Sequence, residues 1–119
     1  MSSENNLNIE ELQLIEQNLQ NLLLQKQNFQ TQLLENEKAM EELKPGSVVY
    51  KIVGNLMIKS DAEDIKKDLK SKDEMLNIRI KNIEKQEEIL KEKAMKKQSN
   101  VLSQISKERS KKWMKWNRF

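Results

Sequence analysis

Apolar residues recur every seven positions along the first part of the chain. Two series run through it: Leu12, Leu19, Lys26, Leu33 and Met40, and Ile15, Leu22, Phe29, Asn36 and Leu43. Eight of these ten positions are apolar, and a repeat sustained over this length is typical of a coiled-coil seam rather than an ordinary surface helix. The pattern therefore predicts a helix over residues 1–44, which Pro45 and Gly46 end.

A second heptad repeat follows later in the chain, with Leu69, Leu76, Ile83 and Leu90 as one series. The complementary series is shared between two sets, one with Ile65, Lys72, Arg79 and Gln86, the other with Ile80, Glu87, Ala94 and Val101. The repeat predicts a second helix over residues 61–106 that begins at a capping box and has a more polar seam. Residues 107–119 are interpreted as a basic aromatic tail, which holds both tryptophans of the chain.

Between the two helical patterns lies the one stretch that predicts strands, in a segment spanning residues 45–60. Gly54-Asn55 divides two runs rich in β-branched residues. This dipeptide indicates a two-residue hairpin turn, because glycine adopts positive φ at no steric cost. The predicted cross-strand pairs are Val53 with Leu56, Ile52 with Met57, Lys51 with Ile58, and Tyr50 with Lys59.

Both faces of this hairpin are largely apolar. An isolated hairpin is marginal in water, and its edges present unpaired N–H and C=O groups. Since nothing else in the sequence predicts a strand, we expect the partner strands to come from other subunits. The residues expected to form this assembly element are Val48, Val49, Tyr50, Ile52, Val53, Gly54, Asn55, Leu56, Met57 and Ile58.

A hairpin returns the chain close to where it left, so the two helices should run antiparallel. If Leu43 lies near Ile65, the residue numbers of facing positions add up to about 108, because both helices rise equally per residue. Leu12 and Ile15 then face a lysine-rich stretch, and everything beyond about Val101 overhangs. That end of the seam should be loose, with apolar groups that either bind a partner or pack in the seam or against a neighbouring subunit.

Composition excludes several classes of function. The 119 residues are 36% apolar and 34% charged, with two Gly, one Pro, no Cys and no His, which is too few apolar residues for a compact core. The lack of cysteine removes disulfides and fits a reducing compartment, and neither a membrane span nor a secretory signal is recognisable. We therefore expect a soluble cytoplasmic protein. Without a catalytic constellation or a phosphate-binding loop, we expect no enzyme, cofactor, metal or small-molecule substrate.

Charge is distributed unevenly along the chain. Residues 1–60 carry 5 Lys and 8 acidic residues, a net charge of −3, whereas residues 91–119 carry 10 Lys and Arg and 2 Glu, a net charge of +8. A basic end can bind nucleic acid, anionic lipid or an acidic partner, or it can simply solvate the helix.

The order helix, β-hairpin, helix in this length resembles the β-type subunits of prefoldin, a molecular chaperone. The match rests on Val49–Lys59 and continues with Arg79-Ile80, Glu84–Glu87, Gln25–Gln27 and Glu37–Leu43. The resemblance covers residues 7–102, and the segment from Ser106 departs from the family pattern.

The resemblance implies a mostly α fold in which a long antiparallel two-helix coiled coil is joined by a β-hairpin that enters an intersubunit β-barrel. It also implies a hexamer of two α-type and four β-type subunits that captures unfolded proteins without ATP and delivers them to a group II chaperonin. Lys96 and Lys97 are the expected chaperonin-docking residues. The residues expected to bind unfolded clients are Leu7, Leu12, Leu14, Ile15, Val101, Leu102, Ile105, Trp113, Met114, Trp116 and Phe119.

Two other functions use part of the same sequence. A passive coiled-coil tether needs the heptads but leaves the apolar hairpin without a purpose. A nucleic-acid or membrane-surface binder would use Trp113 and Trp116 together with the basic residues around them, and it leaves the other hundred residues unexplained.

Overall fold

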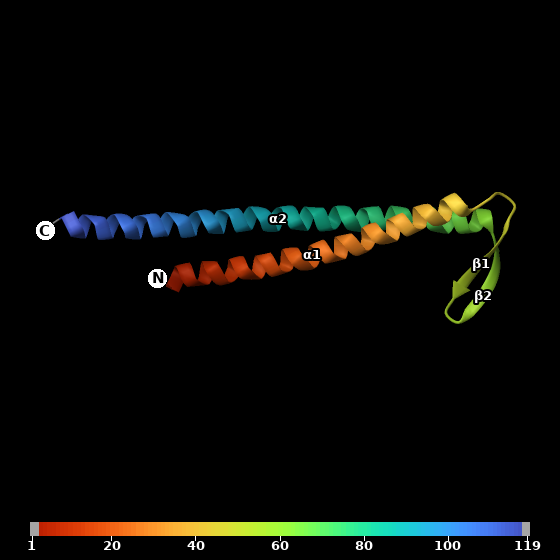
Figure 1. The fold of residues 1–119 in the computed structure, drawn as a ribbon, viewed down its shortest axis with the longest axis horizontal. Coiled ribbons are helices and arrows are strands. Elements are labelled where there is room, and N and C mark those ends of the chain that lie inside the picture. Colours follow the sequence, from red (N-terminus) through yellow and green to blue (C-terminus); the bar gives the residue numbers. More distant parts are fainter. Residues whose placement is uncertain (1–2, 118–119) are drawn as a thin grey trace. The chain divides into compact units, whose positions relative to one another are not determined.

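The computed structural model describes residues 3–117, in the order α1 (Ser3–Glu42), β1 (Val48–Val53), β2 (Leu56–Asp61) and α2 (Ala62–Asn117) (Figure 1). Two long helices with one β-hairpin between them confirm the predicted fold class. The chain divides into two compact units. The hairpin unit is Leu24–Ile83, and the terminal unit comprises the described residues up to Leu23 and from Glu84 onward.

The hairpin has the register that the sequence predicts. β1 and β2 pair antiparallel, and all four expected pairs are present, from Val53 with Leu56 to Tyr50 with Lys59. Pairing continues to Val48 with Asp61, so α2 begins at Ala62 rather than at residue 61. Gly54 has φ +60°, the conformation for which the turn selects glycine.

A tight turn separates α1 from the hairpin. α1 ends at Glu42, two residues before the predicted end. Ser47 donates to the carbonyl oxygen of Lys44 from both its backbone N–H, at 3.1 Å, and its hydroxyl, at 2.6 Å. Gly46 has φ +76°, and the turn therefore directs the chain into β1 at once.

Within the hairpin unit, the seam is made by the predicted heptad positions. From α2, Leu76, Ile80 and Ile83 are buried, and from α1 Asn36 is buried while Leu33 is half-buried. The structure also decides which complementary set of α2 packs. Ile80 faces the seam, whereas Lys72, Arg79 and Gln86 are exposed.

Asn36 is a buried polar member of this seam. It is only 6% exposed, and its Nδ2 donates to Asp73 Oδ1 at 3.3 Å across the two helices. A polar side chain at a single seam position specifies the register of paired helices at a cost in stability. The Asn36–Asp73 bond thus ties α1 to α2 at one register.

Replacing Asn36 by Asp should lower the free energy of unfolding by about 2 kcal/mol at neutral pH, because a donor is lost and two carboxylates meet at a poorly hydrated site. Urea unfolding followed by circular dichroism measures this loss. Asn77→Asp, which places the same charge at an exposed position of α2, is the control, and equal losses in both variants would contradict a role for Asn36 in the seam.

The terminal unit has the same antiparallel register. Lys97 forms an ion pair with Glu11, and Gln104 Nε2 donates to Glu4 Oε2 at 3.4 Å. The residue numbers of both pairs add up to 108, the value that the sequence predicts for facing positions. Seam residues of this unit that are buried or half-buried include Leu12, Ile15, Leu19, Leu22, Glu87, Leu90, Ala94 and Val101.

The end of α2 differs from the prediction, because the helix continues past residue 106 to Asn117. The prediction took the loss of the heptad pattern as the end of the helix. However, no Gly or Pro follows Gly54 in the sequence, and Lys, Arg and Glu are good helix formers even without a packed face. The predicted tail is thus helical throughout its described part, residues 107–117.

Neither described helix is apolar enough over a sufficient length to cross a membrane. Among residues 3–117, acidic side chains do not gather in a group of three or more that could hold a metal ion.

Candidate assembly and client-binding surfaces

The hairpin presents apolar side chains to solvent from both strands. We call this set the hairpin surface; it consists of Val48, Tyr50, Ile52, Val53, Leu56, Met57 and Ile58, all exposed. Ile52 and Met57 are a directly opposed pair and are 71% and 68% exposed. A patch of this kind on a protein surface marks an interaction site.

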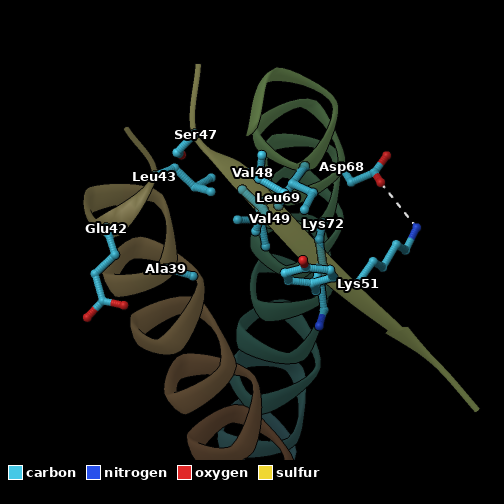
Figure 2. A pocket seen from close by; sticks show the side chains of 12 residues that line it. Ala39, Glu42, Leu43, Ser47, Val48, Val49, Lys51, Asp68, Leu69 and Lys72 are labelled. Carbon is cyan, nitrogen blue, oxygen red and sulfur yellow. Dashed lines mark hydrogen bonds and ion pairs between the residues drawn. The ribbon is translucent and has the colours of Figure 1, made fainter. Parts of the chain in front are cut away.

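The start of β1 lies near the end of α1 and the first turns of α2. A pocket of about 670 Å³ lies there, and Figure 2 shows it lined by Leu43, which directly follows α1, by Val49 of β1 and by Leu69 of α2. Lys51 Nζ lies 3.2 Å from Asp68 Oδ2, and both side chains are more than half exposed. An exposed pair of this kind contributes little stability. The Lys51–Asp68 pair therefore does little to orient the hairpin.

Both strands of the hairpin are edges, because the described residues form a single sheet of two strands. Each outer edge therefore presents backbone N–H and C=O groups without a partner strand. An added strand from another chain could pair with either edge while its side chains cover the apolar faces. The geometry thus suits assembly by strand addition.

In the terminal unit, apolar side chains outside the seam are exposed on both helices. Leu7 and Leu14 lie on α1, and Leu102, Trp113, Met114 and Trp116 on α2. The other predicted client-binding residues are less accessible, since Ile15 is buried and Leu12, Val101 and Ile105 are half-buried in the seam. Phe119 lies outside the described residues.

A family model described as "Prefoldin subunit" matches residues 6–108. The chain belongs to the prefoldin subunit family. Prefoldin subunit beta of Archaeoglobus fulgidus is 35% identical over 101 residues, which cover 82% of this chain and 87% of that protein. Prefoldin subunit beta of Saccharolobus islandicus is 37% identical over 73 residues, which cover 59% of this chain and 58% of that protein.

A solved structure gives the same result for the prefoldin fold. The crystal structure of the prefoldin beta subunit from Thermococcus strain KS-1 superposes with a TM-score of 0.80 at 33% sequence identity. The match covers 87% of this chain and 93% of that one. The resemblance to prefoldin β-type subunits that the sequence suggested is thereby confirmed.

Sequence reasoning assigned no role to several exposed apolar residues, and those in the terminal unit include Ile89 and Met95 on α2. The signal for Met95 was available, because Met95 directly follows Ala94 of the heptad series, just as Leu102 directly follows Val101.

The two predicted docking lysines also differ in the structure. Lys96 is exposed, whereas Lys97 is half-buried and paired with Glu11. Substitution of Lys97 would therefore disturb the seam as well as any docking.

Proposed function

We propose that this chain is the β-type subunit of an ATP-independent chaperone that binds unfolded proteins in the cytoplasm. Membership in the prefoldin family supports the chaperone role, and the lack of cysteine fits a reducing compartment. The observation that carries the proposal is the hairpin surface, which is too apolar and too exposed for a chain that works alone.

The proposed assembly contains two α-type and four β-type subunits, joined by their hairpins into β-barrels. Besides the hairpin surface, the proposed interface includes half-buried Val49 and the turn residues Gly54 and Asn55. Burial of each large apolar side chain in such a barrel contributes about 1.5–3 kcal/mol. A few hairpin residues are thus enough to bring subunits together.

Clients are proposed to bind at the terminal unit by burial of the exposed apolar side chains of both helices. Such burial is non-directional and therefore suits segments of varied sequence. Leu12, Ile15, Val101 and Ile105 support these side chains from the seam. One chain offers few contacts, so binding is individually weak and gains strength when several subunits hold one client.

Replacing Leu7, Leu14 and Leu102 together by Ser should lower the suppression of client aggregation several-fold, because three exposed apolar contacts are lost per chain. The measurement is light scattering from a chemically unfolded client diluted into the assembled complex. The control replaces Leu24, Leu34 and Ile78 by Ser, which are similarly exposed but lie in the hairpin unit. An equal loss in both triple variants, or in neither, would argue against a client site in the terminal unit.

Delivery to a group II chaperonin is proposed to go through Lys96, which is exposed. Lys97 is proposed to contribute less to docking, because it is half-buried and paired with Glu11. Binding of Lys96→Glu assemblies to immobilised chaperonin tests this part. Unchanged affinity would remove Lys96 from the docking site.

A further inference from the structure

The last part of α2 has no neighbouring helix in the described chain. We call residues 106–117 the α2 extension. Gln104 bonds to Glu4, close to where described α1 begins at Ser3, and α2 then runs on to Asn117 (Figure 1). Trp113 and Trp116 are 66% and 84% exposed. The extension is therefore a solvated helix that holds the only two tryptophans of the protein.

One face of this helix combines apolar side chains with a cation. Leu102 and Trp113 are eleven residues apart, as are Ile105 and Trp116, and eleven residues make about three turns of helix. These four side chains therefore share a face. Arg109 falls midway along the same face and is exposed. A ligand that covers this face has to supply both apolar groups and a partner for a guanidinium.

The charged residues of the extension are mostly basic. Lys107, Arg109, Lys111, Lys112 and Lys115 are exposed, and Glu108 is the sole acidic residue among 106–117. By contrast, α1 of the terminal unit carries four Glu and neither Lys nor Arg from Ser3 to Leu23. In this unit α1 is thus acidic and the extension basic, so an acidic ligand is attracted to the extension and not to α1.

We propose that the α2 extension selects unfolded segments in which apolar residues alternate with Asp and Glu. The inference rests on the proposed chaperone function and names the class of client that this part of the terminal unit prefers. Apolar residues of the segment cover Leu102 and the two indoles, and its carboxylates pair with Arg109 and Lys112. Such charge-assisted pairs are strongest as bidentate contacts to arginine.

An acidic apolar peptide fits this face better than a nucleic acid or a membrane does. Bases would stack on the indoles but would leave Leu102 and Ile105 uncovered. A membrane-bound helix buries its apolar face among acyl chains, and Arg109 in the middle of that face opposes such insertion. The four Glu of neighbouring α1 would also be repelled by an anionic surface.

The test uses the full-length chain, whose tryptophan emission reports on the extension alone because both tryptophans lie there. The probes are two unstructured peptides with identical Leu and Val positions, one with Glu and one with Lys at the polar positions, both without Trp and Tyr. The Glu peptide should shift the emission to shorter wavelength and bind about tenfold more tightly than the Lys peptide at low salt. The difference should narrow at about 0.5 M salt, where exposed charges are screened.

Charge variants make the assignment specific. Arg109→Glu with Lys112→Glu should reverse the preference between the two peptides, whereas Lys66→Glu with Lys67→Glu, at exposed positions of α2 in the hairpin unit, should leave it unchanged. Equal binding of both peptides by the natural chain, or an unaltered preference in the Arg109 and Lys112 variant, would overturn the inference. An emission shift with phosphatidylglycerol vesicles or poly(U) but with neither peptide would also overturn it and assign the extension to lipid or RNA.

Failure of this inference can be told apart from failure of the chaperone proposal. If the assembled complex suppresses client aggregation but the chain shows no charge preference, only the selection of acidic segments is wrong. If the complex suppresses no aggregation, the proposed function itself is wrong.

Discussion

Replacing Ile52 and Met57 by Asp should prevent the chain from assembling with other prefoldin subunits while both helices stay folded. The two residues face each other across the hairpin and are 71% and 68% exposed, so the substitution costs the isolated chain little. In an assembled barrel, however, two apolar contacts are lost and two carboxylates have to be dehydrated. Affinity for partner subunits should fall by a factor of at least about 100.

The measurement is the mass of the complex by light scattering after the variant is mixed with an α-type prefoldin subunit. Leu24→Asp with Leu34→Asp is the control, because these leucines are also exposed but lie on α1 outside the hairpin. The control variant should form a complex of natural mass. A complex of natural mass from the hairpin variant would mean that subunits meet through another surface.

Replacing Leu76 by Ala should destabilise the hairpin unit strongly. Leu76 is 2% exposed, the lowest value among the large apolar residues described. Deleting its side chain leaves a cavity in the seam between α1 and α2, which costs about 3 kcal/mol. The melting temperature should fall by about 10 °C.

Thermal unfolding followed by circular dichroism measures this effect. Met75→Ala is the matched control, since Met75 is the neighbouring residue on α2 and is 53% exposed. Its substitution should change stability by no more than about 0.5 kcal/mol. Similar melting temperatures for the two variants would show that the heptad seam does not hold this unit together.

Periodicity and turn chemistry determined most of the fold. The heptad series places Leu76 and Ile83 in the seam because a seven-residue repeat keeps one stripe of a helix facing its partner. The Gly54-Asn55 turn sets the register of the hairpin because a two-residue loop allows only one pairing of the flanking strands. Because both helices rise equally per residue, counting back from Leu43 near Ile65 then places Glu11 opposite Lys97.

The extent of α2 was harder to predict from sequence. Heptads mark where a helix has a partner, and beyond Gln104 α2 has none in the described chain. Residues 107–117 remain helical on intrinsic propensity alone, a weaker signal than a packed apolar stripe. The boundary at 106 therefore marked the end of the repeat and not the end of the helix.

By itself, the sequence determined the element order, the hairpin register and the antiparallel facing of the helices, because these follow from local periods and turn geometry. Only the tertiary structure decided which side chains near the seam are buried. It packs Ile80 and exposes Arg79, and it pairs Lys97 while leaving Lys96 exposed. Residues one position apart on a helix differ by 100° in direction. Which of the two packs depends on the rotation of each helix about its axis, and that rotation is set by the whole interface.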